Sequence, residues 1–263
     1  MPDDSNRRKS ALVTGASRGI GRAIALGLAA RGVRVAVHYH TNEAAAIAVR
    51  GQLAGDGHAV CSADLTDGEA AARLWRAVTA AFGTVDILVN NAGLFFDHPP
   101  LTTAYEGWQA AWRLTLAANL IGPANLTYLA AQTMVVQSAA ADGGSGRGRI
   151  VNISSRGAFR GEPDAPAYGA SKAGLNSFSQ SMAKALAPQG VYVYCLAPGF
   201  VETDMAAVLL AGPGGPDIVA QHPLGRVSLP EEVARTAVFC ALDAPAAMTG
   251  SIIDVNGASY LRT

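Results

Sequence analysis

A tyrosine and a lysine stand four residues apart in the segment Tyr168-x-x-x-Lys172. On a helix this spacing puts both side chains on one face, so that the ammonium group can lie near the phenol oxygen. A free tyrosine has a pKa of about 10, and a close cation would have to supply roughly 3 to 4 kcal/mol to lower it by about 2 to 3 units. The pair therefore predicts a tuned proton donor. The alternative interpretation is an ordinary pair on an amphipathic helix.

The elements around this pair alternate in type along the chain. Strands are expected at residues 10–14, 33–38, 58–63, 85–90, 149–154 and 191–196, and helices at 19–31, 43–53, 66–82, about 105–137 and about 167–186. Such alternation predicts a parallel sheet with helices on both faces. We expect an α/β protein with a three-layer Rossmann fold, whose doubly wound parallel sheet has about seven strands. Without a composition break or repeat, residues 1–263 are expected to form a single domain, with residues 1–8 flexible.

Composition favours small-molecule chemistry. Half of the residues are hydrophobic and only 15% are charged, and 20 basic residues balance 20 acidic ones. This balance argues against a general nucleic-acid binder or a binder of anionic membranes. Cys61, Cys195 and Cys240 are odd in number and widely spaced, which indicates buried free thiols and a cytoplasmic, reducing location. The cysteines and the five histidines show no metal-ligand spacing, and the first apolar run is too short for a signal peptide.

No residue is charged between Leu114 and Ala141. This stretch is long enough for a membrane-spanning helix to be considered. Polar residues and a proline interrupt the stretch at Asn119, Gly122, Pro123, Asn125, Gln132 and Gln137. A helix buried on two sides, by its own core and by another subunit, explains this pattern better than a membrane helix. The helix after Tyr168 carries further apolar residues, so a symmetric helical interface is expected.

A glycine-rich turn joins the first strand to the first helix. Glycines at this spacing allow a sharp turn and a close approach to a pyrophosphate, and the following helix N-terminus supplies amide donors. Its position after a strand and before a helix makes dinucleotide binding the favoured interpretation over a merely structural turn. The expected contacts are Gly15, Ser17, Arg18, Gly19, Ile20 and Gly21.

The end of the second strand should meet the adenosine ribose of a dinucleotide. A carboxylate there would bind the 2′-hydroxyl of NAD, but this chain has His38-Tyr39-His40. Arg18 can reach the same region and would attract a 2′-phosphate. We therefore expect NADP(H) to be preferred, with NAD(H) as the alternative. His38 is a candidate contact with the cofactor. The alternatives are that Arg18 is a solvated surface cation and that His38 is a polar residue at the strand end with no ligand.

Two more strands end in candidate cofactor contacts, because ligands of open α/β sheets bind beyond the carboxyl ends of the strands. Asp64 and Leu65 follow the third strand, and Asn91, Ala92 and Gly93 follow the fourth. Asp64 could accept a hydrogen bond from the adenine amino group or could cap a helix. Thr66-x-x-Glu69 just beyond it has the spacing of a capping box.

Taken together, these motifs resemble those of the short-chain dehydrogenase/reductase family, in its compact single-domain, classical branch. The resemblance covers about Arg8 to Leu261 and rests on the glycine-rich turn, Asn90-Asn91-Ala92-Gly93, Asn119, Ser154-Ser155, Tyr168-x-x-x-Lys172 and Pro198-Gly199. Within the family the chain looks most like the 3-oxoacyl-acyl-carrier-protein reductase group. That likeness is carried by residues 198–205, 223–226 and 254–257. Members of this group act on varied substrates, so the likeness does not identify the substrate.

The resemblance implies a role for each matching residue. Tyr168 would be the general acid toward a carbonyl, or the base when an alcohol is oxidised, and Lys172 would lower its pKa and hold the nicotinamide ribose. Ser155 would hydrogen-bond the substrate oxygen, since it precedes Tyr168 by the family's spacing, with Ser154 as the competing candidate. Asn119 would hold a water that relays protons to Lys172, or else form a satisfied inter-helix hydrogen bond. Further cofactor contacts are expected at Pro198, Gly199, Val201 and Thr203.

The substrate side is less defined. Residues 205–221 are expected to form a mobile lid, interrupted by Gly212-Pro213-Gly214-Gly215-Pro216. Phe95, Arg156 and Phe159 are the candidate substrate contacts, with local packing and solvation as the alternatives.

The chemistry expected from these residues is NADPH-dependent reduction of a ketone to a secondary alcohol, with a 3-oxoacyl thioester as one substrate class. An NAD(P)-dependent alcohol or sugar dehydrogenase working oxidatively is the alternative. A cofactor-sensing protein without activity is disfavoured, because Ser155, Tyr168 and Lys172 are all present. The family likeness also implies a homotetramer, with a dimer as the alternative.

Overall fold

A computed structural model describes residues 7–137 and 146–262 of the chain. Its centre is a seven-stranded sheet in the order β3-β2-β1-β4-β5-β6-β7, in which all neighbouring strands are parallel. The strands are β1 (Ser10–Val13), β2 (Arg34–Tyr39), β3 (Ala59–Ser62), β4 (Ile87–Asn90), β5 (Gly148–Ile153), β6 (Val191–Pro198) and β7 (Ile252–Val255). The expected doubly wound sheet is confirmed.

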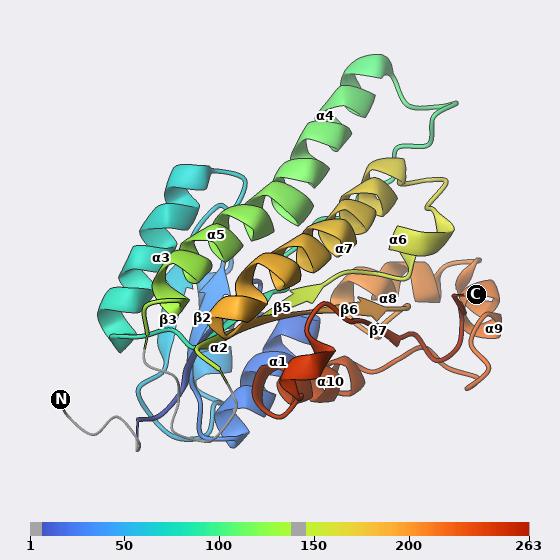
Figure 1. The fold of residues 1–263 in the computed structure, drawn as a ribbon. Helices are drawn as coiled ribbons and strands as arrows, with labels where there is room; N and C mark the ends of the chain where they lie inside the picture. The colour runs from blue at the N-terminus through green and yellow to red at the C-terminus, as the bar shows by residue number, and fades with distance from the viewer. Residues whose placement is uncertain (1–6, 138–145, 263) are drawn as a thin grey trace.

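Helices cover both faces of the sheet and make three layers (Figure 1). One core packs β1 residues Ala11 and Val13 against α1 (Gly19–Ala30), α2 (Glu43–Arg50) and α10 (Pro230–Leu242). The opposite core packs Leu12 against α3 (Gly68–Phe82), α5 (Gly122–Met134) and α7 (Pro166–Leu186). Successive residues of β1 thus face opposite layers, which explains why Ala11, Leu12 and Val13 are all apolar.

The long helix expected near residues 105–137 is interrupted. It consists of α4 (Tyr105–Leu116), a π-helical turn (Ala117–Ile121) and α5, which ends at Met134. Pro123 has no N–H for the ordinary helical bond, and a Cβ on Gly122 would come within 2.7 Å of the Leu65 carbonyl oxygen. The π-helical turn at Asn119 has a wider backbone spiral than the α-helices on either side of it. Such turns often occur at functional sites.

Several predicted element ends differ from the structure. The capping box at Thr66 is wrong, because the N-cap of α3 is Asp67, whose carboxylate accepts a 2.9 Å hydrogen bond from the Glu69 N–H. Thr66 instead donates its hydroxyl to Asp64, at 2.7 Å. At the start of the chain, Arg7 pairs with Asp86 at 2.6 Å, so this part of the segment expected to be flexible is anchored.

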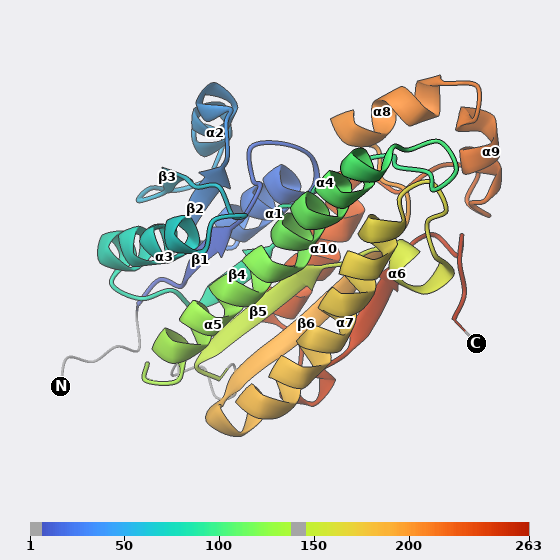
Figure 2. The ribbon, with the colours of Figure 1, turned by 90° about the horizontal axis from the view of Figure 1, so that it is seen from above.

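The lid region forms two short helices rather than one continuous helix, α8 (Asp204–Ala211) and α9 (Gly215–Ala220). A Cβ on Gly215 would overlap the Leu210 carbonyl, so the tight reversal between the helices requires a glycine there. Figure 2 shows both helices beside α6 (Gly157–Arg160), at the end of the sheet where α7 begins. Two short 3₁₀ turns (Ala187–Gln189 and Ala246–Met248) complete the elements.

Within the described parts of the chain, none of the helices has both the length and the apolar character that a bilayer crossing needs.

Candidate active site

The four residues expected to do chemistry gather beyond the carboxyl ends of β4 and β5. Gly93, which follows β4, lies between two of them, since a Cβ there would be 3.2 Å from Asn119 Oδ1 and 3.6 Å from Lys172 Nζ. The Lys172 ammonium lies 5.7 Å from the ring centroid of Tyr168. The hydroxyl of Ser155, which follows β5, lies close enough to the Tyr168 phenol to lower its pKa. The fold therefore assembles residues from a π-helical turn, a strand end and α7 into one cluster.

Lys172 is buried, with 4% of its surface exposed. Its Nζ donates a 2.8 Å hydrogen bond to the Ile153 carbonyl at the end of β5. Desolvation lowers the pKa of Lys172 to about 8, and the nearby Cys195 thiol opposes that shift. The Lys172 amine is therefore fixed by the Ile153 carbonyl and can gain or lose a proton near neutral pH.

The pKa of Tyr168 departs from the value that the spacing suggested. Lys172 was expected to lower it, but desolvation by the surrounding groups raises the pKa of Tyr168 to about 12. The nearby Ser155 hydroxyl acts in the opposite direction, and the charge of Glu162 adds to the increase. The Lys172 ammonium donates its hydrogen bond to the Ile153 carbonyl. At neutral pH the phenol is accordingly protonated.

The two neighbouring serines have different surroundings. Ser154 is 3% exposed and donates its hydroxyl to the Lys172 carbonyl at 3.2 Å, which ties β5 to α7. Ser155 Oγ accepts a 3.0 Å hydrogen bond from the Gly157 N–H, and its hydroxyl lies against Tyr168. The residue favoured by spacing is thus the one beside the phenol, and its contact with substrate stays a prediction.

Asn119 is fully buried in the π-helical turn. Its Oδ1 accepts from the Leu94 N–H at 2.7 Å, and its Nδ2 donates to the Leu94 carbonyl at 2.9 Å and to Ser171 Oγ at 3.2 Å. The Asn119 amide therefore has protein partners for its hydrogen bonds, including Ser171 on α7, as the alternative of an inter-helix hydrogen bond predicts. A relay role through a water stays a prediction.

The glycine-rich turn suits a dinucleotide pyrophosphate. Gly15 and Gly19 have positive φ values of 60° and 53°, a conformation that favours glycine. A Cβ on Gly21 would overlap the Gly15 carbonyl and the Asn91 amide, so α1 packs tightly behind the turn. The N-cap Arg18 makes no side-chain capping bond, so no cap occupies the amide donors of the first turn. The residues present therefore fit the phosphate groups of a nicotinamide dinucleotide.

Two side chains brace this turn from both sides. Asn91 Nδ2 donates to the carbonyls of Thr14 and Gly15, at 2.9 and 3.2 Å, while Thr14 Oγ1 accepts from the Asn91 N–H at 2.9 Å. On the other side, His38 Nδ1 accepts from the Gly15 N–H at 3.1 Å and Nε2 contacts the Ala63 carbonyl at 3.1 Å. His38 is 2% exposed, and burial lowers its pKa to about 4. Its observed role is thus to hold the turn.

The adenosine side carries exposed polar groups. Arg18 is exposed, and His40 Nε2 lies 3.8 Å from Asp64 Oδ2. Asp64 Oδ1 accepts from the Thr66 N–H and hydroxyl, and these bonds lower the pKa of Asp64. Asp64 thus forms a local turn with Thr66 and does not cap α3, whose N-cap is Asp67. The contact of Asp64 with adenine stays a prediction. Leu65 is buried beside it.

The segment expected to meet the nicotinamide begins at Pro198, the last residue of β6. The Pro198 carbonyl accepts the Arg156 N–H at 2.8 Å, and the Gly199 N–H donates to the Val255 carbonyl at 3.2 Å. Val201 forms an isolated bridge with Ser228. Thr203 lies directly against the glycine-rich turn, since a Cβ on Gly19 would be 3.2 Å from its Cγ2. Thr203 is therefore placed near the expected phosphates.

The three candidate substrate contacts have different surroundings. The Phe95 ring packs edge-to-face on Tyr168, with centroids 5.0 Å apart. Phe159 lies on α6 under the Arg262 guanidinium, 4.5 Å from its centroid. Arg156 is 2% exposed and donates to Gln221 Oε1 at 2.9 Å. Its charged end thus contacts the lid, and burial lowers its pKa to about 10. Substrate contact by these three residues stays a prediction.

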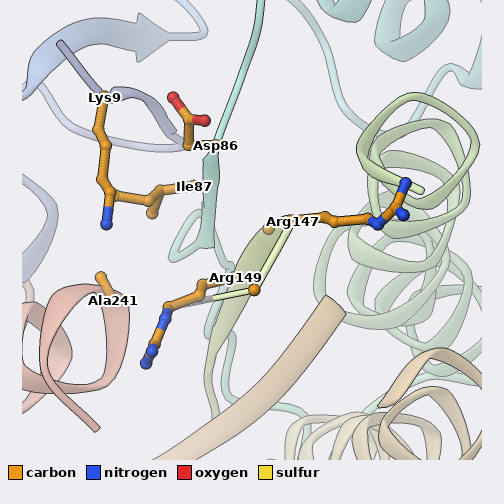
Figure 3. Close-up of a pocket in the computed structure, with 8 residues that line it drawn as sticks. Lys9, Asp86, Ile87, Arg147, Arg149 and Ala241 are labelled. Carbon is orange, nitrogen blue, oxygen red and sulfur yellow. The ribbon is translucent and has the colours of Figure 1, made fainter. Parts of the chain in front are cut away.

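A polar pocket lies beside the amino ends of three strands (Figure 3). Lys9 and Asp86, which line it, stand just before β1 and β4, and Arg149 is the second residue of β5. Ligands of open α/β sheets bind at the carboxyl ends of the strands, so this pocket is not the candidate active site. Among residues 7–137 and 146–262, no group of three or more His, Cys, Asp or Glu is arranged to hold a metal ion.

Some residues that organise the site had no clear sequence signal. The contacts of Thr14, His98 and Gln221 were not predicted, although Gln221 ends the segment expected to form the lid. Thr14 carries a weak signal, because a hydroxyl at a strand end just before a glycine can hold a turn. Gln221 and His98 carry none, because their partners Arg156 and Ala167 are distant in sequence.

Comparisons with known proteins agree with this geometry. The family model described as short chain dehydrogenase matches residues 9–213. The chain is 40% identical over 250 residues to a 3-oxoacyl-[acyl-carrier-protein] reductase of Synechocystis sp., covering 94% of this chain and 95% of that relative. It is 38% identical over 253 residues to the reductase of the same name from Escherichia coli, covering 96% and 98%. An acetoacetyl-CoA reductase of Shinella zoogloeoides is 35% identical over 250 residues, covering 95% and 98%.

The matched segment includes the glycine-rich turn, Ser155, Tyr168 and Lys172, and the three relatives match nearly from end to end. The chain therefore belongs to the short chain dehydrogenase family and is an NAD(P)-dependent oxidoreductase that acts on carbonyl or hydroxyl groups.

Proposed function

We propose that the protein reduces a ketone to a secondary alcohol with NADPH, and that Tyr168 is the proton donor. The observation that carries this proposal is the cluster beyond the ends of β4 and β5, in which the Tyr168 phenol lies beside Ser155 and near the buried Lys172. The raised pKa of Tyr168 keeps its phenol protonated. A protonated phenol is the form that donates to a developing alkoxide. The same chemistry in the oxidative direction would need the phenolate.

The nicotinamide cofactor supplies the hydride when it is bound. Gly15, Gly19 and the first turn of α1 would hold its phosphates, and Gly93 leaves room beside Lys172 and Asn119. Ser155 and Tyr168 would both hydrogen-bond the substrate oxygen, which orients the carbonyl and draws charge toward it. Tyr168 then transfers its phenolic proton to that oxygen. Lys172 would stabilise the resulting phenolate, with a water near Asn119 returning the proton.

The preference for NADPH rests on charge. Arg18 is exposed at the start of α1, and residues 38–42 at the end of β2 include no carboxylate that would repel a 2′-phosphate. His40 lies on the same side, near Asp64. A guanidinium binds phosphate oxygens through charge-assisted bonds that contribute roughly 1.5 to 3 kcal/mol.

We further propose a 3-oxoacyl thioester as the substrate class. The curated relatives named above are reductases of such thioesters. Phe95 beside Tyr168 and the half-exposed Phe96 offer apolar surface for an acyl chain.

We also propose a cytoplasmic homotetramer. Leu114, Ile121 and Tyr128 are 47%, 51% and 60% exposed along α4 and α5, which is apolar area suited to a symmetric interface. Cys61, Cys195 and Cys240 are all free thiols, as in proteins of reducing compartments.

The deciding experiment measures oxidation of NADPH and NADH by the purified protein with acetoacetyl thioesters, small diketones and cyclic or aromatic ketones. Thioester turnover with NADPH would support the full proposal. Tyr168→Phe should abolish turnover yet keep cofactor affinity, because it removes only the phenolic oxygen. Retained turnover in this variant would overturn the role of Tyr168, and turnover of other ketones alone would overturn the substrate class.

A further inference from the structure

The helix that carries Tyr168 and Lys172 begins without a capping residue of its own. The N-cap of α7, Ala165, offers no side-chain cap, and the first helical residue is Pro166, which has no N–H. Tyr168 and Gly169 donate their N–H groups back to the Ala165 carbonyl, at 2.9 and 3.3 Å. The Ala167 N–H is then the first-turn donor that needs a partner from elsewhere, and Ala167 is fully buried.

His98 supplies that partner from the loop after β4. The Ala167 N–H donates to His98 Nε2 at 3.1 Å, and His98 is only 2% exposed. The other ring nitrogen, Nδ1, lies 2.9 Å from the Phe96 carbonyl oxygen. A carbonyl can only accept, so Nδ1 carries the proton and Nε2 is left as the acceptor. The partners of His98 thus assign it one neutral tautomer.

Further contacts lock the imidazole in this orientation. The His98 N–H donates to the Asp164 carbonyl at 2.7 Å, just before α7 begins. Its ring packs edge-to-face on Trp108 of α4, with centroids 5.5 Å apart. His98 therefore joins the loop, α4 and the first turn of α7.

The same loop touches the reacting tyrosine. Phe95 packs against the Tyr168 ring at 5.0 Å, and the loop is held at Leu94 by Asn119 and again at His98. Ala167 immediately precedes Tyr168, so the hydrogen bond to His98 fixes the main chain next to the phenol. A shift of about 1 Å in a reacting group can cost roughly a hundredfold in rate.

We propose that His98 is a positioning residue for Tyr168, which it orients by accepting the Ala167 N–H at the start of α7. The inference rests on the proposed function, in which Tyr168 donates the proton. His98 makes no contact with the reacting atoms, so its effect passes through the backbone and through Phe95.

Two conservative substitutions separate its two hydrogen bonds. In His98→Gln, the side-chain oxygen can reach the place of Nε2 and still accept from Ala167. In His98→Asn, the shorter amide can take the place of Nδ1 and still donate to Phe96, but the helix end loses its acceptor. His98→Leu removes both bonds.

The test compares these three variants with the native enzyme under saturating NADPH, using whichever ketone of the panel the native enzyme reduces. The kcat of His98→Asn and His98→Leu should fall by roughly tenfold or more, with a larger isotope effect from deuterated NADPH, because the chemical step slows. NADPH affinity should be unchanged. His98→Gln should restore kcat to within roughly threefold of native.

A matched control is His58, a half-buried histidine that also bridges a backbone N–H and a carbonyl. Its Nδ1 accepts from Val35 and its Nε2 contacts the Ala54 carbonyl, each at 3.1 Å. His58→Leu should lower thermal stability and leave kcat unchanged. Native kcat in His98→Asn, or an equal loss in the Gln and Asn variants, would overturn the inference.

Amide exchange at residues 165–172 gives a readout independent of turnover. Protection should fall in the Asn and Leu variants and persist in the Gln variant. A native protein that turns over no ketone would contradict the proposed function. Amide exchange at residues 165–172 would then still show whether His98 stabilises the start of α7. Unchanged protection in His98→Asn would overturn the inference in either case.

Discussion

Asn119 and Leu94 exchange two hydrogen bonds, in which the side-chain amide accepts the Leu94 N–H at 2.7 Å and donates to the Leu94 carbonyl at 2.9 Å. The Asn119 amide thus forms with the Leu94 backbone the same pair of hydrogen bonds that a residue of an adjacent β-strand would form. This pairing comes from a π-helical turn and is fully buried. It places the loop beside Gly93, where Asn119 and Lys172 approach one another.

Asn119→Asp tests this clamp with almost no change in shape. The carboxylate can still accept from Leu94, but it cannot donate to the Leu94 carbonyl or to Ser171. The free energy of unfolding should fall by about 1 to 3 kcal/mol, as for buried groups that lose a partner. Asn125→Asp, on the half-buried part of α5, is the control and should cost less. Equal urea-unfolding curves for the two variants would show that the clamp contributes little.

Arg18→Ser tests cofactor selectivity. Removal of the guanidinium should weaken NADPH binding by roughly ten- to a hundredfold and change NADH binding little, because only NADPH carries the 2′-phosphate. Nicotinamide fluorescence measures both dissociation constants. Arg22→Ser, one turn along α1 where Arg22 bonds Gln52 at 2.8 Å, is the matched control. An equal loss for both cofactors would contradict a phosphate contact.

Gly21→Ala should abolish dinucleotide binding. The added methyl would overlap the Gly15 carbonyl and the Asn91 amide, which are themselves held in place by hydrogen bonds, so α1 must move away from the turn. Thermal stability should fall as well, by roughly 1 to 3 kcal/mol for an overpacked site. At Gly51 the same substitution makes only ordinary contacts at 3.6 Å and serves as the control. Native-like NADPH affinity in Gly21→Ala would show that the turn tolerates displacement.

His38 should make the protein sensitive to mild acid. Its pKa is about 4 in the folded chain against an ordinary value of 6.5, so the unfolded chain binds more protons between these values. The stability that neutral His38 contributes is present above pH 6.5 and is lost as the pH falls toward 4, by about 3 kcal/mol. His38→Asn can keep an acceptor for the Gly15 N–H and cannot be protonated, so its unfolding free energy should fall less over this range. Parallel pH curves for the two proteins would refute the assignment.

Much of the fold followed from local patterns. Strands buried on both faces are mostly apolar, as in β1, and their runs differ clearly from the helical periodicity of the segments between them. The four-residue spacing predicted that Tyr168 and Lys172 share one face of a helix, and the family resemblance singled out Ser155, which lies beside Tyr168. The π-helical turn did not follow, since helical periodicity over five residues does not distinguish it from an α-helix.

The direction of the Tyr168 pKa shift shows the limit of such reasoning. Spacing places Lys172 near the phenol, but it says nothing about the Ile153 carbonyl that binds the ammonium or about the groups that desolvate the ring. Desolvation depends on elements that meet only in the folded chain. For the same reason Arg156 appeared open to substrate in the sequence but is buried against the lid.

The contact between Arg156 and Gln221 leads to a final prediction about the lid. Gln221 follows α9 and accepts from Arg156, which stands next to Ser155, so the bond joins the lid to the catalytic cluster. Gln221→Ala leaves a buried guanidinium without this acceptor, which should weaken lid closure by about 1 to 3 kcal/mol. We expect a raised KM for the ketone and faster proteolysis within 204–220, with kcat reduced less. Gln52→Ala removes a similar arginine partner on an exposed surface and should change neither. Native KM and native proteolysis in Gln221→Ala would show that the contact does not hold the lid.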